Sequence, residues 1–230
     1  MTSLTWTLPL PSSVPAPAWR LRRTLPLISL VVRILCAVLI RSYLRTFHRL
    51  EIQGRENLPA GRFIMVANHA SHLDTLCMLA ALPLNRLHEV YPAAAADYFF
   101  ADPIRQSMAE LVVNALPFDR HDNSRDSLAL CEGLLQDGNA LIYFPEGTRS
   151  PTGEMQRFRS GIGRLATATG VPVVPCRLEG CGAVWPKGRL LPRPGKVALR
   201  IGEPRSYGEN DGVLEIAAEL EQRVALPSLS

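Results

Sequence analysis

Seven residues from Asn68 to Asp74, with the sequence NHASHLD, carry side chains that could perform acid–base chemistry. They lie between two apolar runs, 63–67 and 76–82, so we predict a strand that ends before them and a helix that begins within them. Open α/β sheets hold reactive groups outside the carboxyl ends of their strands. His69 is therefore a candidate general base.

Asp74 is the candidate partner of His69. A histidine removes a proton well near neutral pH when a carboxylate holds its other ring nitrogen. Two residues five apart on one helix point about 140° away from each other, so this pair can meet only if His69 lies on the loop. Ser71-x-x-Asp74 is a capping-box pattern that would begin the helix just after His69, and it gives Asp74 an alternative, purely structural role.

A second polar turn follows the apolar run 140–144, which we predict to be a buried strand. Its residues are Pro145-Glu146-Gly147-Thr148-Arg149-Ser150. Gly147 permits close approach of a ligand to the backbone, and the planar guanidinium of Arg149 matches phosphate or carboxylate. The alternative is a polar loop in which Glu146 and Arg149 pair with each other.

Length and composition favour one domain, alone or with appendages. The chain has 230 residues, of which 47% are hydrophobic, enough for a substantial core. A formal charge of +4 and a pI near 9.0 favour anionic partners. The five cysteines are odd in number, scattered and without Cys-x-x-Cys spacing, so we expect reduced thiols facing a cytosolic environment.

The N-terminal part divides into two segments ahead of a domain at 50–226. Four prolines predict that residues 1–23 form a disordered tail. Residues 24–49 are predicted to form a membrane-associated helix, whose apolar stretch is short for a membrane span and contains Arg33. On a helical period one narrow polar stripe appears, formed by Arg22, Pro26, Ser29, Arg33, Ala37, Arg41 and Arg45.

This stripe favours an amphipathic helix lying in the headgroup region, with its basic residues reaching anionic lipid. A spanning helix, a signal peptide and an ordinary core helix are the alternatives. The long proline-rich leader and the lack of a small-residue cleavage site before Arg41 argue against a signal peptide. The arginines on both flanks argue against a core helix.

Elsewhere, strands alternate with helices, which predicts the α/β class. Further strands are expected at 171–175, at 197–201 and at 90–96, where the alanines also suit a helix. An edge element is expected at 116–120, because Pro117 is barred from a central strand. Helices are expected at 72–82, 102–114, 124–136, 161–169 and 213–224.

Over roughly residues 50–205 these stretches together resemble the glycerolphosphate acyltransferase family, and within it the bacterial 1-acylglycerol-3-phosphate acyltransferases. The four sequence blocks that carry the resemblance are Asn68-His69-x4-Asp74, Phe118-Asp119-Arg120, Phe144-Pro145-Glu146-Gly147-Thr148-Arg149-Ser150 and Val171-Pro172-Val173-Val174-Pro175. The third matches letter for letter. Two departures stand out: Asn114 to Pro117 replaces a segment that usually begins with glycine, and Phe158-Arg159-Ser160-Gly161 has one cation fewer than Phe-Lys-Lys-Gly.

The resemblance implies a mixed central sheet flanked by helices and a reaction without metal or other cofactor. An acyl group would move from acyl-CoA or acyl carrier protein to the free hydroxyl of 1-acylglycerol-3-phosphate, giving phosphatidic acid. His69 would be the base, oriented by Asp74. The acceptor would be bound by Arg120, Glu146, Gly147, Thr148, Arg149 and Arg159, with the arginines on its phosphate and Glu146 on its glycerol. It further implies membrane lipid rather than nucleic acid as partner, at the cytoplasmic face of the inner membrane.

Three other functions stay open. A family member of this kind could act on another lysolipid or hydroxylated acceptor. A metal-dependent hydrolase could use His69, His72 and Asp74, although no motif spacing brings His48, His88 or His121 to them. A non-catalytic membrane-binding module would need the N-terminal helix but not the His69 and Asp74 pair.

Overall fold

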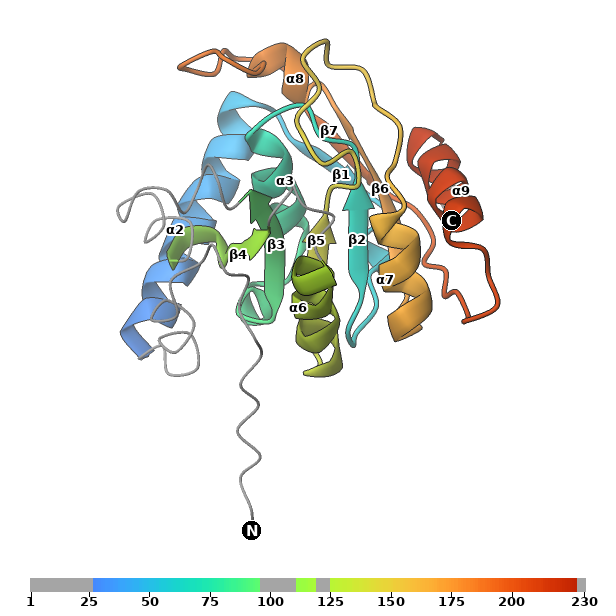
Figure 1. Ribbon diagram of the computed structural model, residues 1–230. Helices are drawn as coiled ribbons and strands as arrows, with labels where there is room; N and C mark the ends of the chain where they lie inside the picture. Colours follow the sequence, from blue (N-terminus) through green and yellow to red (C-terminus); the bar gives the residue numbers. More distant parts are fainter. Residues whose placement is uncertain (1–26, 96–110, 119–124, 227–230) are drawn as a thin grey trace.

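One mixed sheet forms the centre of the protein (Figure 1). The computed structural model describes residues 27–95, 111–118 and 125–226. In this part of the chain seven strands pair in the order β1-β7-β6-β2-β5-β3-β4. The strands are β1 Glu51–Gln53, β2 Ile64–Ala67, β3 Val90–Ala95, β4 Leu116–Phe118, β5 Ala140–Tyr143, β6 Val173–Glu179 and β7 Ala198–Ile201. The helices are α2 Leu27–Phe47, α3 Leu73–Ala81, α6 Arg125–Gln136, α7 Gly161–Thr169, α8 Cys181–Val184 and α9 Val213–Ala225.

The strand directions confirm the expected mixed α/β sheet. β6, β2, β5, β3 and β4 are parallel, whereas β7 is antiparallel to β6 and parallel to β1. β2 and β5 are direct neighbours, with Val66 opposite Tyr143. Both strands therefore end at the same edge of the sheet, and each leads into one of the two polar turns.

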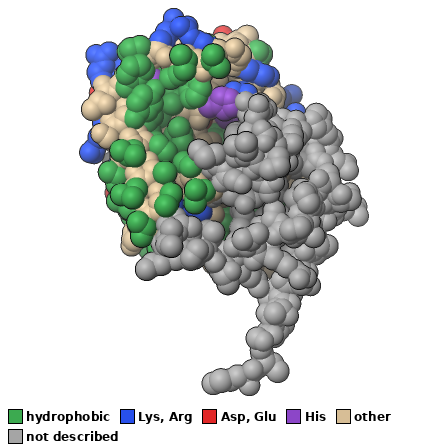
Figure 2. Space-filling view, turned by 90° about the vertical axis from the view of Figure 1, so that its left-hand side faces the viewer, with side chains coloured by type: hydrophobic (Ala, Val, Ile, Leu, Met, Phe, Trp, Pro, Cys, Tyr) green, Lys and Arg blue, Asp and Glu red, His purple; other side chains and the backbone are tan. Residues whose placement is uncertain are grey.

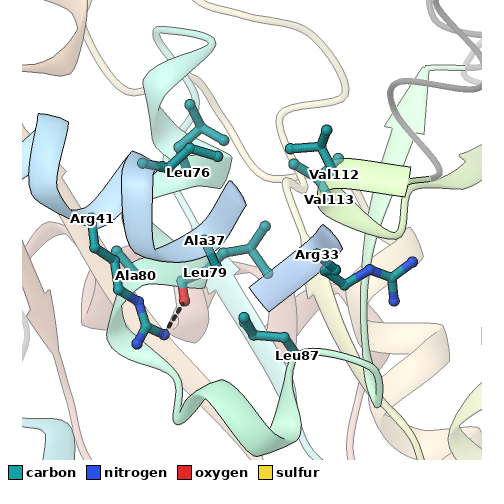
Figure 3. Close-up of a pocket in the computed structure, with 10 residues that line it drawn as sticks. Arg33, Ala37, Arg41, Leu76, Leu79, Ala80, Leu87, Val112 and Val113 are labelled. Atoms are coloured by element: carbon teal, nitrogen blue, oxygen red, sulfur yellow. Dashed lines mark hydrogen bonds between the residues drawn. The ribbon is translucent and has the colours of Figure 1, made fainter. Parts of the chain in front are cut away.

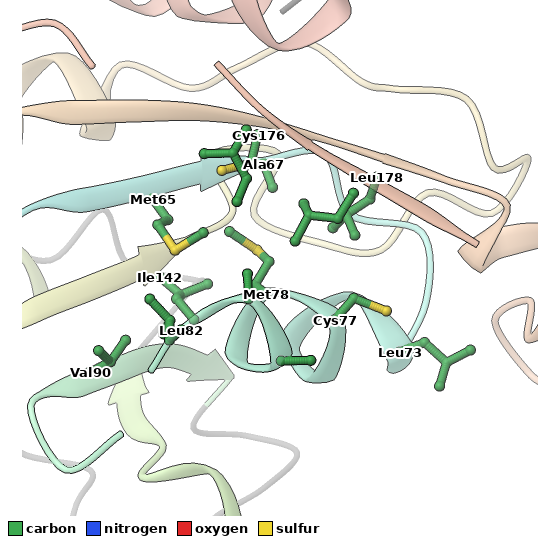
Figure 4. Close-up of a cluster of buried hydrophobic side chains, with 14 of the residues drawn as sticks. Met65, Ala67, Leu73, Cys77, Met78, Leu82, Val90, Ile142, Cys176 and Leu178 are labelled. Carbon is green, nitrogen blue, oxygen red and sulfur yellow. The ribbon is translucent and has the colours of Figure 1, made fainter. Parts of the chain in front are cut away.

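Helices cover both faces of the sheet (Figure 1). α2 packs on α3 on one face, and α7 packs on α6 and α9 on the other. Each face has its own buried cluster. Figure 4 shows the first of them, in which Met65, Ala67 and Ile142 of the sheet face Cys77 and Met78 of α3. This packing fixes α3, and with it Asp74, against the ends of β2 and β5.

Most predicted elements are confirmed, and the differences concern short or proline-containing segments. β1 and α8 span three and four residues, too few for a periodic pattern to show. The strand predicted to end at Pro175 in fact continues to Glu179. Pro175 is tolerated in this central strand for two reasons. Its carbonyl accepts the N–H of Gly202, and the pairing with β7 begins only at Cys176, so the missing N–H of Pro175 removes no hydrogen bond from that pairing.

Asn114 takes the place of the glycine that the second sequence block usually has. Its φ of 58° is left-handed, a conformation that asparagine tolerates better than most residues. Its side-chain amide donates to the carbonyls of His88 and Val90. It thereby leads the chain into β4 at the sheet edge, where an edge element was expected. The tail at 1–23, most of the helix at 102–114, and Arg120 lie outside the described residues.

Two arginines of the polar stripe on α2, Arg33 and Arg41, face the protein (Figure 3), which corrects the expectation that they reach lipid. Arg45, further along the stripe, is exposed. Arg33 is 3% exposed and donates to the carbonyl of Leu111, and Arg41 donates to the carbonyls of Leu79 and Leu82. The last carbonyls of a helix have no partner within it, so the end of α3 offers acceptors to Arg41. Arg33 and Arg41 therefore line a cavity between α2 and α3.

The opposite, apolar side of α2 faces outward. Val31, Leu35, Val38 and Leu39 are 47–70% exposed, and Figure 2 shows hydrophobic side chains spread over this side of the molecule. Among the described helices none has the length and apolar character to cross a bilayer. The apolar side of α2 therefore stays available to lipid, whereas Arg33 and Arg41 are taken up by contacts within the protein.

Candidate active site

The His69 ring and the Asp74 carboxylate are in contact, with 2.9 Å between Nδ1 and Oδ2. His69 lies on the loop after β2, and Asp74 lies in the first turn of α3. The same oxygen of Asp74 accepts the backbone N–H groups of Ala70 and Ser71 at 2.7 Å each, and Ser71 Oγ accepts the N–H of Leu73. Asp74 therefore fulfils both predicted roles at once, holding the imidazole and capping the turn.

The imidazole presents its second nitrogen outward. An ionised carboxylate only accepts hydrogen bonds, so in the neutral imidazole Nδ1 is the donor to Asp74 and Nε2 keeps the lone pair. Within the described chain Nε2 has no hydrogen-bond partner, and 20% of the side chain is exposed. The ring stacks on Phe144 with 4.1 Å between centroids. His69 thus has a fixed orientation and one nitrogen available for a proton.

The loop after β5 holds the backbone of His69 from both sides. The N–H of His69 donates to Glu146 Oε1 at 2.8 Å, and the carbonyl of His69 accepts the N–H of Ser150 at 2.8 Å. Toward β6, the side-chain amide of Asn68 forms two hydrogen bonds with the backbone of Leu178. The loop that carries His69 is therefore hydrogen-bonded to the loop after β5 on one side and to β6 on the other.

Glu146 is a buried carboxyl group with 2% exposure. Burial raises its pKa to about 7, against the opposing effect of the N–H groups of His69 and Gln156. Its Oε2 has no hydrogen-bond partner among the described residues, and no described ion pair joins it to Arg149. Glu146 therefore does not pair with Arg149, which was the structural alternative for this loop. Its carboxyl accepts the backbone N–H of His69.

Cations surround this loop. Arg149 is half-buried and close to His72, whose pKa falls to about 4 because of burial, then Arg149 and His69. Arg159 packs over Gly147, where an added Cβ would lie 2.7 Å from the guanidinium carbon. The φ of Gly147 is +74°, so glycine is needed here for conformation as well as for space. Thr148, the next residue, is half-buried.

Sequence reasoning missed three residues that the fold brings here. Phe144 stacks on His69, and the ring centroids of Trp185 and His72 are 5.4 Å apart. The charge of Arg177 lowers the pKa of Glu146, against the larger effect of burial. Phe144 ends a predicted strand and is the first residue of the third block, so the sequence could have indicated its place beside His69. Arg177 and Trp185 come from later segments and carry no spacing signal. Among the described residues no group of three or more His, Cys, Asp and Glu side chains is clustered as metal ligands are.

Comparison with known proteins gives three similarities. A family model described as Acyltransferase matches residues 49–179. The 1-acyl-sn-glycerol-3-phosphate acyltransferase BAT2, chloroplastic, of Brassica napus is 35% identical over 173 residues, which are 73% of this chain and 48% of that protein. The 1-acyl-sn-glycerol-3-phosphate acyltransferase of Pseudomonas aeruginosa is 30% identical over 182 residues, 76% of this chain and 65% of that protein. The chain thus spans about half to two thirds of the length of these relatives.

One solved structure has the same arrangement over most of its length. It is the 1-acyl-sn-glycerophosphate (LPA) acyltransferase PlsC from Thermotoga maritima, with a TM-score of 0.69 and 27% identity. The match covers 92% of this chain and 82% of that one. The similarity in fold therefore extends beyond the residues that the family model matches.

Proposed function

Because the chain belongs to the acyltransferase family, we propose that it moves a fatty acyl group from an acyl thioester to the free hydroxyl of 1-acylglycerol-3-phosphate, giving phosphatidic acid. The relatives named as acyltransferases for this acceptor support the choice of substrate. The thioester is acyl-CoA or acyl carrier protein, used as a co-substrate, and the reaction needs no metal.

The observation that carries this proposal is the bond between His69 Nδ1 and Asp74 Oδ2 at the edge of the sheet. It leaves Nε2 as a proton acceptor beside a loop that bears Arg149. A poised imidazole next to a guanidinium suits an acceptor that combines an alcohol with a phosphate.

His69 acts as general base and then as general acid. Its Nε2 takes the proton from the acceptor hydroxyl while that oxygen attacks the thioester carbonyl carbon. The tetrahedral intermediate collapses, the carbon–sulfur bond breaks, and the imidazolium returns the proton to the leaving sulfur. Asp74 keeps the tautomer and stabilises the imidazolium, as a carboxylate does in serine-protease triads. No covalent enzyme intermediate is formed.

Arg149 and Arg159 bind the acceptor phosphate, together with Arg120. Gly147 allows Arg159 to lie against the loop backbone, so the two guanidiniums share one turn. Glu146 acts mainly through His69, because its carboxyl is buried and bonded to the His69 N–H. This replaces the expected direct contact between Glu146 and the glycerol.

The membrane supplies the acceptor, and α2 is the proposed contact with it. The contact runs through the exposed apolar side chains of α2 and not through Arg33 and Arg41, which bond within the protein. We place the protein at the cytoplasmic face of the membrane, where acyl thioesters are available.

The deciding experiment offers the purified chain in detergent a panel of lysolipids with acyl-CoA and with acyl carrier protein. Products are read by mass spectrometry and thiol release is followed with time. His69→Ala should abolish transfer, whereas His88→Ala, at an exposed histidine outside the site, should not. Transfer by His69→Ala at a near-normal rate would refute the base. Preference for another lysolipid would point to the second candidate, the same chemistry on a different acceptor.

A further inference from the structure

The loop between α8 and β7 combines basic and apolar side chains in an unusual way. From residue 180 to 202 the chain has five cations, Lys187, Arg189, Arg193, Lys196 and Arg200, and no acidic residue. Lys196 pairs with Glu51 and Arg200 with Glu179. The other three are exposed, and none of them forms an ion pair with a carboxylate within the described residues.

Leu190 and Leu191 project from the same loop. They are 86% and 70% exposed, so neither contributes to the core. Single exposed leucines are common on protein surfaces, but two adjacent ones between three unpaired cations form a small apolar tip with a basic collar. Such a tip matches the acyl boundary and the anionic headgroups of a bilayer.

The loop has a defined shape that holds this tip outward. Trp185 Nε1 donates to the carbonyl of Arg189 at 2.9 Å, and Arg189 Nε donates to the carbonyl of Leu191 at 3.1 Å. Arg193 bonds back to α8 through its Nε to Ala183 O at 3.0 Å. Arg189 and Arg193 each have further donors on the guanidinium, which remain available for phosphate oxygens.

The loop lies next to both α2 and the candidate active site. Where the loop joins β7, the N–H of Val197 donates to the carbonyl of His48, just after the end of α2. At its beginning, Trp185 contacts His72. In Figure 1 the loop extends toward the side on which α2 packs, and Figure 2 shows basic side chains along the rim of the apolar surface there.

We propose that residues 186–193 form a second lipid-binding element, which inserts Leu190 and Leu191 into an anionic bilayer while Lys187, Arg189 and Arg193 bind its headgroups. The contact holds the candidate active site near the lipid surface, because Trp185 at the start of the loop packs beside His72. The inference adds to the proposed function, and lipid binding can be measured without any acyl transfer. An acidic protein is the other partner that a basic loop could attract, but it gives no reason for two exposed leucines.

The test is flotation of the full chain with vesicles of phosphatidylglycerol and phosphatidylcholine, without acyl donor. The double variant Leu190→Ser/Leu191→Ser should lower the partition coefficient about tenfold or more, from the apolar area it removes. Lys187→Gln should lower it about fivefold on anionic vesicles and leave binding to pure phosphatidylcholine unchanged.

Matched controls lie on helices of the opposite face. Leu214→Ser changes a leucine of α9 that is 69% exposed, and Arg164→Gln changes an exposed cation of α7. Neither should alter vesicle binding. Equal binding by the double leucine variant and the parent would overturn the proposal, as would an equal loss in the Leu214 control. Unchanged vesicle binding with lost retention on immobilised acyl carrier protein would assign the loop to an acidic protein instead.

Discussion

The main-chain N–H of His69 donates to Glu146 Oε1 across 2.8 Å, although 77 residues separate the two in sequence. The bond joins the loops that follow β2 and β5, which are neighbouring parallel strands. A buried carboxyl thus holds the backbone of the proposed base, and the placement of Nε2 depends on a side chain that need not touch the substrate.

Replacing Glu146 should separate positioning from binding. Glu146→Gln keeps an acceptor for the His69 N–H, so kcat should stay within about threefold of the parent. Glu146→Ala leaves that N–H unsatisfied, which costs about 1–3 kcal/mol. The loop then shifts, and kcat should fall by about a hundredfold with little change in the acceptor KM. A large rise of that KM in Glu146→Gln would show direct contact with the acceptor and contradict the positioning role.

Glu146 should also shape the pH dependence of stability. Its pKa is raised from 4.5 to about 7 by burial, so the folded state binds the proton more tightly than the unfolded chain does. The stability it contributes is full below about pH 4.5 and is lost as pH rises to about 7. Relative to the parent, Glu146→Gln should therefore gain stability between about pH 5 and about pH 8, by at most about 3 kcal/mol. Urea unfolding of the parent and of Glu146→Gln at about pH 5 and about pH 8 measures this difference. A stability difference between the two proteins that is the same at both pH values would contradict it.

Asp74→Asn should lower kcat by roughly 10³-fold or more, because the amide no longer enforces the tautomer with its lone pair on Nε2. The substitution also weakens the bonds to the Ala70 and Ser71 backbone, so the melting temperature should fall. Steady-state kinetics and thermal unfolding measure the two effects. Glu209→Gln, at an exposed carboxylate, is the control and should change neither. A variant that melts earlier but keeps its kcat would leave Asp74 with the capping role only.

Arg149→Ala should raise the KM for the lysolipid acceptor about 10–100-fold, the loss expected for charge-assisted hydrogen bonds. The KM for the thioester should change little, because the guanidinium binds only one of the two substrates. Arg164→Ala, at an exposed position on α7, provides the comparison. An equal rise of both KM values would show that Arg149 supports the loop as a whole.

Gly147→Ala should raise the acceptor KM, whereas Gly153→Ala should not. Both glycines have positive φ, +74° and +84°, so alanine costs about 1–2 kcal/mol at either position. Only at Gly147 does the new Cβ meet the Arg159 guanidinium, since nothing lies within 4 Å at Gly153. Similar stability losses with a raised acceptor KM in Gly147→Ala alone would show that Arg159 is displaced. Equal kinetics in the two variants would exclude a role for that contact.

Local pattern was sufficient for much of the fold. The helix expected at 161–169 is α7, Gly161–Thr169, and the runs 140–144 and 197–201 contain β5 and β7. These segments are bounded by glycine or polar turns and have one clear period, so neighbouring residues alone specify them. Short elements such as β1 and α8 exist only through pairing and packing with distant segments, and no local pattern could predict them.

The candidate site divides in the same way. Spacing within one loop was enough to predict that His69 and Asp74 meet, because capping of α3 by Asp74 brings its carboxylate beside the preceding loop. The inward turn of Arg33 and Arg41 was decided by carbonyls on other segments, Leu111, Leu79 and Leu82. The contacts of Glu146, Arg177 and Trp185 likewise depend on which strands become neighbours. Periodicity records which side of an element is polar, but only the packed fold determines what that side meets.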